Sequence, residues 1–172
     1  MTAPATGSAT GSATGPATGP ATGPATGPAT GPATGPATGP ATGPDPACRA
    51  LGIALEEAAG GRARLRMRVT EDMVNGHGVA HGGYLFLLAD AAFDHACNSR
   101  GPVMLAHSAQ VTFLRPAAAG DVLVAEATER ARHGRHGVYD VTVRRPAGEV
   151  VAEFRGHGVV VAGRPIDERK TP

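Results

Sequence analysis

Residues 75–98 of the chain read NGHGVAHGGYLFLLADAAFDHACN, and this stretch decides the fold. Its first part is rich in glycine and contains two histidines. The remainder, residues 84–98, is apolar on almost every side of a helical projection, which is typical of a helix enclosed by other structure. Gly101 and Pro102 follow shortly afterwards and predict where that helix ends. Asp90 places a carboxylate about two turns inside this buried helix, and we interpret it as a catalytic residue.

The first 44 residues are a low-complexity repeat. From Ala5 to Pro44 they follow Ala-Thr-Gly-Ser and then Ala-Thr-Gly-Pro units. Glycine and proline at this density disfavour helices and strand ladders, and the repeat has no large apolar side chain to bury. We therefore expect residues 1–44 to be a disordered tail, residues 45–162 to form one domain, and residues 163–172 to be a loose C-terminal tail.

The charged residues nearly balance, with 16 Lys and Arg against 15 Asp and Glu. Such a balance gives no general attraction to nucleic acid, and no stretch is long and apolar enough to span a membrane. The two cysteines, Cys48 and Cys97, do not suggest a disulfide framework. We therefore expect a cytoplasmic protein that binds neither nucleic acid nor a membrane.

Most of the remaining domain has the pattern of short strands. Arginines alternate with apolar residues over residues 62–69, which predicts a strand with one buried face and one solvated, arginine-rich face. Further strand patterns cover residues 53–58, 103–114, 121–132, 136–144 and 149–161. Within residues 103–114, alternation places Ala109 and Phe113 on the same face of the strand. Within residues 121–132, it places Ala131 on the same face as the apolar residues.

Two further signals complete the expected fold. Residues 45–51 predict a short helix, with Asp45 as its N-cap and Pro46 at its first position. Short turns between successive strands indicate antiparallel pairing. The expected fold class is therefore α+β, with one antiparallel sheet wrapped around one long central helix.

Several short motifs stand in a specific order along the domain. They are NGH at 75–77, HGG at 81–83, LAD at 88–90, ACNS at 96–99, FLRP at 113–116, GVYD at 137–140 and FRG at 154–156. Together they resemble the hotdog-fold thioesterases of the phenylacetic acid degradation type, the PaaI type. This resemblance implies a hotdog fold and a homotetramer built from dimers. It also implies hydrolysis of acyl-CoA thioesters, typically phenylacetyl-CoA or its ring-hydroxylated derivatives, with coenzyme A as part of the substrate and no separate cofactor.

The resemblance also implies roles for individual residues. By position, Asp90 matches the catalytic acid, Gly82 the backbone donor to the thioester carbonyl, and Asn75 and His81 the supporting polar residues. Ala91 departs from the family pattern, in which a hydroxyl residue often follows the aspartate, and this leaves rate and substrate preference open. Four further residues are candidates for substrate binding, with pocket, interface or solvated positions as their other interpretations: Gly83, Asp94, Asn98 and Arg115.

The spacing of Gly82 and Asp90 predicts how such a site would be assembled. Eight residues of helix separate them, which corresponds to about 12 Å along the axis, so one thioester carbon cannot touch both within one chain. Two antiparallel helices would bring Gly82 of one copy near Asp90 of the other, so we expect a homodimer that shares its active site. The glycine amide at the helix start would donate to the developing oxyanion, while Asp90 would act either as nucleophile or as general base.

Other functions fit the sequence less well. A zinc site at His77 and His81 would need a helix, which the neighbouring glycines disfavour, and we expect no metal. A hydratase using Asp90 and His95 is disfavoured because residues five apart in a helix differ by about 140° around its axis. A non-catalytic acyl-CoA-binding hotdog protein and a thioesterase for medium-chain aliphatic acyl-CoA remain as alternatives.

Overall fold

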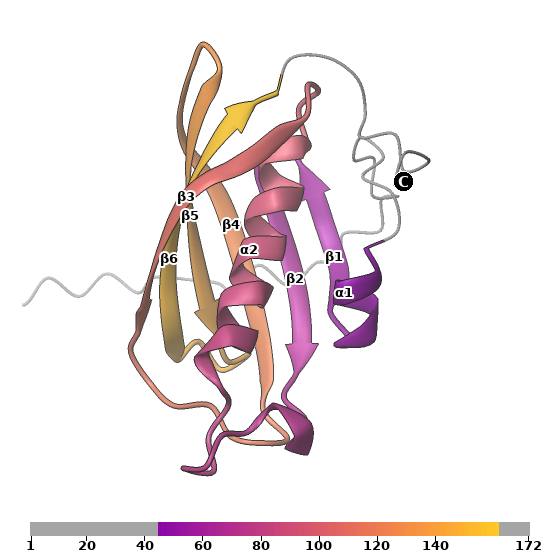
Figure 1. The fold of residues 1–172 in the computed structure, drawn as a ribbon, viewed down its shortest axis with the longest axis vertical. Helices are drawn as coiled ribbons and strands as arrows, with labels where there is room; N and C mark the ends of the chain where they lie inside the picture. Colours follow the sequence, from indigo (N-terminus) through magenta and orange to yellow (C-terminus); the bar gives the residue numbers. More distant parts are fainter. Residues whose placement is uncertain (1–44, 162–172) are drawn as a thin grey trace, which may run out of the picture. The chain divides into compact units, whose positions relative to one another are not determined.

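A computed structural model describes residues 45–161, so the predictions for the repeat 1–44 and for the tail 163–172 lie outside the described residues. An antiparallel sheet of six strands, in the order β1-β2-β4-β5-β6-β3, curves around the helix α2 (Figure 1). The elements are α1 (Pro46–Ala50), β1 (Ala54–Ala59), β2 (Arg62–Arg68), the 3₁₀ turn η1 (Glu71–Met73), α2 (Gly82–Asn98), β3 (Met104–Phe113), β4 (Val122–His133), β5 (His136–Arg144) and β6 (Val150–Val160). The expected α+β architecture, a sheet around one long helix, is confirmed.

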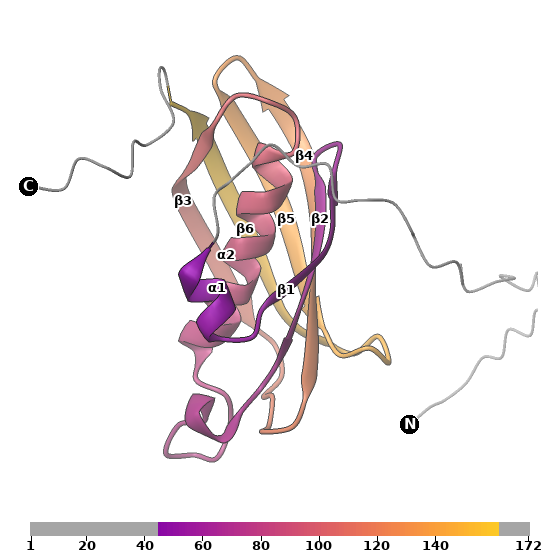
Figure 2. The same ribbon diagram turned by 90° about the vertical axis from the view of Figure 1, so that its right-hand side faces the viewer.

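The short helix α1 begins as its sequence predicts. The side chain of Asp45 accepts a hydrogen bond from the backbone N–H of Cys48 at 2.9 Å, and Pro46 occupies the first helical position. Figure 2 shows this helix on the same side of the sheet as α2. Its buried Cys48 side chain anchors it to the core.

The core lies between α2 and the concave face of the sheet. The ring of Phe93 on α2 meets that of Tyr139 on β5 edge-on, with centroids 5.5 Å apart. Glycine on β6 permits this close packing, because a Cβ at Gly156 would stand 2.6 Å from Cδ2 of Phe93. The side of α2 that faces the sheet is therefore fixed by packing, which leaves the opposite side for other contacts.

The strand β3 lies at the edge of the sheet, and only β6 pairs with it among residues 45–161. Several of its apolar residues are exposed, including Leu105 (39 %) and Phe113 (50 %), whereas Met104 at its start is buried. Alternation predicted that Ala109 and Phe113 share a face, but it did not show that this face stays largely uncovered.

One prediction of which face of a strand a side chain occupies was wrong. Ala131 is exposed, although alternation along β4 placed it with the buried residues. The register between β4 and β5 shifts between Glu129 and Ala131, and such a bulge moves the following side chains to the other face.

No helix within residues 45–161 is both long and apolar enough to cross a membrane.

Candidate active site

The loop before α2 is held by backbone hydrogen bonds. His81 N–H donates to the carbonyl of Met73 at 2.8 Å, and Ala80 N–H donates to that of Ala117 at 2.7 Å. His81 occupies the N-cap position of α2, yet its side chain makes no capping hydrogen bond and is exposed. A capping role for the imidazole is thereby excluded, and its expected role beside the substrate stays a prediction.

Asn75 shapes the same loop. Its Oδ1 accepts a hydrogen bond from His77 N–H at 2.8 Å, and its carbonyl accepts one from Gly78 N–H at 2.9 Å. Gly78 adopts a positive φ of 74°, which a residue with a side chain rarely does. Asn75 therefore has a structural role, and the Nδ2 group makes no hydrogen bond within the described part of the chain.

Asp90 is partly buried on α2, and within residues 45–161 no hydrogen bond or ion pair reaches its carboxylate. Burial, followed by the negative charge of Asp94, raises the pKa of Asp90 above its ordinary value. A purely structural acid in a helix would be stabilised by hydrogen bonds from neighbouring groups, and the described residues provide none for Asp90. An enclosed carboxylate with a raised pKa and no partner is a candidate catalytic group.

Asp94 and Asn98 continue the polar side of α2. Oδ1 of Asp94 accepts a hydrogen bond from Nδ2 of Asn98 at 2.9 Å. Asn98 is only 4 % exposed, and it also donates to Met104 O at 3.0 Å and accepts from Met104 N–H at 2.8 Å. Asn98 thus joins the end of α2 to the start of β3, and its expected role in substrate binding stays a prediction.

Gly82 begins α2 and lies directly against Phe113 at the end of the edge strand β3. A Cβ added at Gly82 would stand 2.9 Å from Cζ of Phe113, whereas a Cβ at Gly83 would meet only the His81 ring, at 3.9 Å. The half-exposed Phe113 ring therefore forms a wall beside the backbone amides of the helix start. Sequence reasoning did not propose Phe113 as a site residue, although the FLRP motif contains it.

Known proteins similar to this chain cover the part that contains the candidate site residues. The thioesterase superfamily model matches residues 77–152, which include His81, Gly82 and Asp90. Acyl-coenzyme A thioesterase PaaI of Escherichia coli strain K12 is 43 % identical over 119 residues, which span 69 % of this chain and 85 % of that protein. The chain belongs to the PaaI-type hotdog-fold acyl-CoA thioesterases.

Solved structures agree with this assignment. The PaaI-type thioesterase described here matches the E. coli PaaI structure with a TM-score of 0.68 and 43 % identity, covering 69 % of this chain and 86 % of that one. It matches the TT0310 protein of Thermus thermophilus with a TM-score of 0.66 and 39 % identity, covering 69 % and 99 % of the two chains. The fold is therefore the hotdog fold, and the reaction is hydrolysis of acyl-CoA thioesters.

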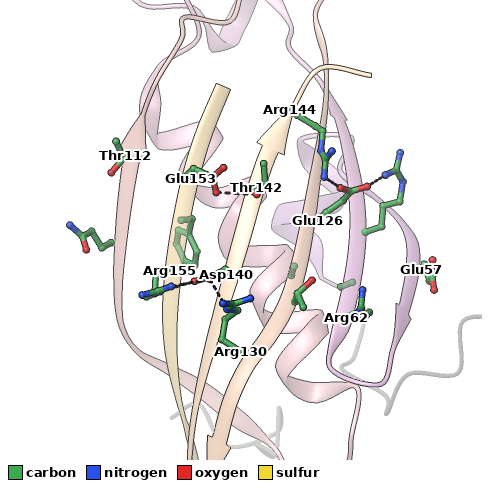
Figure 3. A pocket seen from close by; sticks show the side chains of 16 residues that line it. Glu57, Arg62, Thr112, Glu126, Arg130, Asp140, Thr142, Arg144, Glu153 and Arg155 are labelled. Atoms are coloured by element: carbon green, nitrogen blue, oxygen red, sulfur yellow. Dashed lines mark hydrogen bonds and ion pairs between the residues drawn. The ribbon is translucent and has the colours of Figure 1, made fainter. Parts of the chain in front are cut away.

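The thioesterase also has a large hollow, with a volume of about 840 Å³, on the face of the sheet opposite α2 (Figure 3). Its side chains alternate along the strands with the core residues, so it lies away from Asp90. Each of two acids in it bridges two arginines, which offsets part of the positive charge of this arginine-rich face. These ion pairs join Glu126 to Arg64 and Arg144, and Asp140 to Arg130 and Arg155.

Arg115 follows β3 and was a candidate for binding coenzyme A. Its Nη1 donates to Val150 O at 2.9 Å, and its Nε lies 3.3 Å from a carboxylate oxygen of Glu149. The side chain is about half exposed. Contact with the substrate therefore stays a prediction for this arginine.

The described residues of the thioesterase contain no candidate metal centre. Within residues 45–161, no group of three or more histidine, cysteine, aspartate or glutamate side chains is placed to hold a metal ion. The absence of a separate cofactor stays a prediction.

Proposed function

We propose that this thioesterase hydrolyses arylacetyl-CoA thioesters, phenylacetyl-CoA or its ring-hydroxylated derivatives, in a site shared by two copies of the chain. The observation that carries the shared site is the position of Gly82 and Asp90 in one continuous helix. They are separated by about 12 Å along its axis, too far for both to meet one thioester carbonyl.

The free edge of β3 supports a two-fold dimer. Its backbone groups are unpaired on the outer side within the described fold, and Leu105, Phe113 and Leu114 expose apolar surface beside them. Pairing of β3 with β3 of a second copy would cover this edge and set two α2 helices side by side. The resemblance to the PaaI type extends this proposal to a homotetramer built from such dimers.

In the proposed reaction, the Gly82 N–H of one copy donates to the thioester oxygen, aided by the positive end of the α2 dipole. Asp90 of the other copy takes a proton from water, and the resulting hydroxide attacks the carbonyl carbon. The tetrahedral intermediate collapses, the carbon–sulfur bond breaks, and the departing coenzyme A thiolate takes the proton from Asp90. The raised pKa of Asp90 makes its carboxylate a better proton acceptor, which suits it to the role of general base in this route.

The choice of an aromatic acyl group has two supports. The half-exposed Phe113 ring lies against Gly82 at the start of α2, and the partly buried Phe86 ring packs edge-on against Phe154 with centroids 5.4 Å apart. The solved E. coli relative is described as the PaaI protein of the phenylacetic acid degradation operon. The buried free thiols of Cys48 and Cys97 also fit the proposed cytoplasmic location.

The acyl preference and the role of Asp90 can be tested together. Release of coenzyme A thiol is measured with phenylacetyl-CoA, its hydroxylated derivatives and medium-chain aliphatic acyl-CoAs. Asp90→Asn should lower kcat/KM by about 10²–10⁴-fold with KM little changed. Glu153→Gln on the opposite face of the sheet is the control and should keep full activity. Equal cleavage by wild type and Asp90→Asn would remove Asp90 from the mechanism, and a preference for aliphatic chains would replace the arylacetyl assignment.

Mixing two inactive variants tests the shared site directly. In a mixed dimer of Asp90→Asn and Gly82→Ala chains, one site combines both defects and the other combines both intact residues. Random reassociation should restore about a quarter of the wild-type sites. If each chain carries its own complete site, the mixture will stay as inactive as its parents.

A further inference from the structure

One side of α2 faces away from the sheet of its own chain. Gly83, Leu87, Asp90 and Asp94 follow each other there at helical spacing, and none of them is fully buried. Two of these four residues are acids. Asp94 therefore shares the uncovered side of α2 with the proposed general base, one helical turn away and about 6 Å from it between Cβ atoms.

Asp94 is held in place by the end of its own helix. Nδ2 of Asn98 donates to Oδ1 of Asp94 at 2.9 Å and to its backbone carbonyl at 3.0 Å. Asn98 is itself fixed by hydrogen bonds to the backbone N–H and carbonyl of Met104 at the start of β3. The Asp94 carboxylate thus has a defined position relative to Asp90, rather than the freedom of a surface side chain.

The two acids differ in what stabilises their ionised forms. The neighbouring His95 and a hydrogen bond from Asn98 both favour the ionised form of Asp94 against the effect of its burial. Asp90 receives no hydrogen bond within residues 45–161, so burial and the charge of Asp94 both favour its protonated form. Burial raises the pKa of both acids, but only Asp94 has neighbours that stabilise its charge, and that charge further raises the pKa of Asp90.

The other titratable groups near the pair do not cancel this effect. Cys48 of α1 and Cys97 of α2 both have pKa values raised to about 12, chiefly by burial, so both thiols are neutral when the acids titrate. Asp45 at the start of α1 adds another negative charge near Asp94. His95 is the one cationic group that acts on Asp94 among those described, and no ion pair with Asp90 forms within residues 45–161.

We propose that Asp94 is a positioning residue for the hydrolysis, which acts on Asp90 through its fixed negative charge. Repulsion between the two carboxylates makes Asp90 a stronger proton acceptor than an isolated aspartate, and so suits it to deprotonate water near neutral pH. This inference rests on the proposed role of Asp90, but the electrostatic coupling can be measured without turnover.

The test compares wild type with Asp94→Asn, Asp94→Glu and Glu153→Gln. Asp94→Asn removes the charge but keeps an oxygen that can accept from Asn98, while Asp94→Glu keeps the charge. Aspartate carboxyl carbons are labelled with ¹³C and titrated by NMR, and the Asp90 signal is identified by its absence in Asp90→Asn. In Asp94→Asn the Asp90 midpoint should move down by about one pH unit, whereas Asp94→Glu and Glu153→Gln should leave it within a few tenths of a unit.

The pH profile of kcat/KM provides the second measurement. Its acid limb should move down by about one pH unit in Asp94→Asn, and the plateau of kcat should fall by about threefold because Asp90 has become less basic. An Asp90 midpoint that does not move in Asp94→Asn would overturn the inference, whatever the rates. If wild type cleaves no thioester, the proposed function fails, and the NMR titration still decides whether Asp94 acts on Asp90.

Discussion

Phe113 lies against Gly82 so closely that a Cβ at residue 82 would stand 2.9 Å from Cζ of the ring. The edge strand of the sheet therefore meets the start of the central helix at the amide assigned to the oxyanion. A side chain at residue 82 would have to displace the half-exposed Phe113 ring, and the conflict is steric because α2 has an ordinary helical backbone there. The neighbouring Gly83 faces no such restriction, which makes the two glycines a matched pair.

Gly82→Ala should lower kcat/KM by about 10²-fold or more, because either the ring or the amide must move from its position. Gly83→Ala should stay within about threefold of wild type, since its nearest contact would be an ordinary one at 3.9 Å. Steady-state kinetics on the preferred acyl-CoA checks both values.

Removal of the Phe113 ring tests whether its contact with residue 82 explains the effect of Gly82→Ala. Phe113→Ala introduced into Gly82→Ala should recover part of the lost activity, because the added methyl group then has room. If the double variant is no more active than Gly82→Ala, contact with Phe113 is not the reason that residue 82 is glycine.

Asp90→Asn should stabilise the folded protein at neutral pH although it lowers activity. The pKa of Asp90 is raised from its ordinary value of 3.8 in the folded protein, so the folded state binds more protons than the unfolded state between the two pKa values. Wild-type stability therefore falls as the pH rises through that interval and stays lower above it, whereas the neutral amide avoids this loss.

Thermal unfolding as a function of pH checks this expectation. The Tm of Asp90→Asn should exceed that of wild type at pH 7, and the difference should disappear below about pH 3.8. A Tm for Asp90→Asn below that of wild type at pH 7 would mean that Asp90 stabilises the fold.

Asn98→Ala should destabilise the thioesterase by about 2–4 kcal/mol, because the buried backbone N–H of Met104 loses its acceptor and the Met104 carbonyl loses its amide donor. Gln110→Ala, at an exposed position of the strand β3 that also contains Met104, should change stability by less than about 0.5 kcal/mol. Urea unfolding followed by circular dichroism measures both. Equal stability of Asn98→Ala and wild type would contradict the structural role assigned to this side chain.

Leu105→Lys should separate the proposed dimer. Leu105 is 39 % exposed on the edge strand, and a lysine there is one of the changes that natural proteins use to block pairing of sheet edges. Sedimentation velocity should show smaller particles, and activity should fall together with the fraction of dimer. A protein that sediments as wild type with full activity would place the contact elsewhere.

Much of this fold could be predicted from the sequence because its elements carry clear periods. The alternation over residues 62–69 and 136–144 matches β2 and β5 almost residue for residue. The stretch around Asp90 was assigned to an enclosed helix, and α2 is that helix. The shared site could be predicted because the distance between Gly82 and Asp90 along one helix depends only on the number of residues between them.

The parts that were missed depend on contacts between distant segments. The bulge at Glu129 reverses the facing of Ala131, and no local pattern announces such an insertion. The pairing of Asn98 with Met104 and the contact of Phe113 with Gly82 both follow from the position of β3 at the sheet edge. Strand order is a tertiary property, so these roles became apparent only in the folded chain.

The open side of β3 also offers a means of inhibition that needs no resemblance to an acyl group. An extended peptide that copies residues 104–113 would present the same donors and acceptors to that edge as a second subunit does in the proposed dimer. Such a competitor would deprive each active site of its neighbour's contribution without entering the catalytic cleft. Its potency would weaken as enzyme concentration rises, which would distinguish it from a substrate analogue.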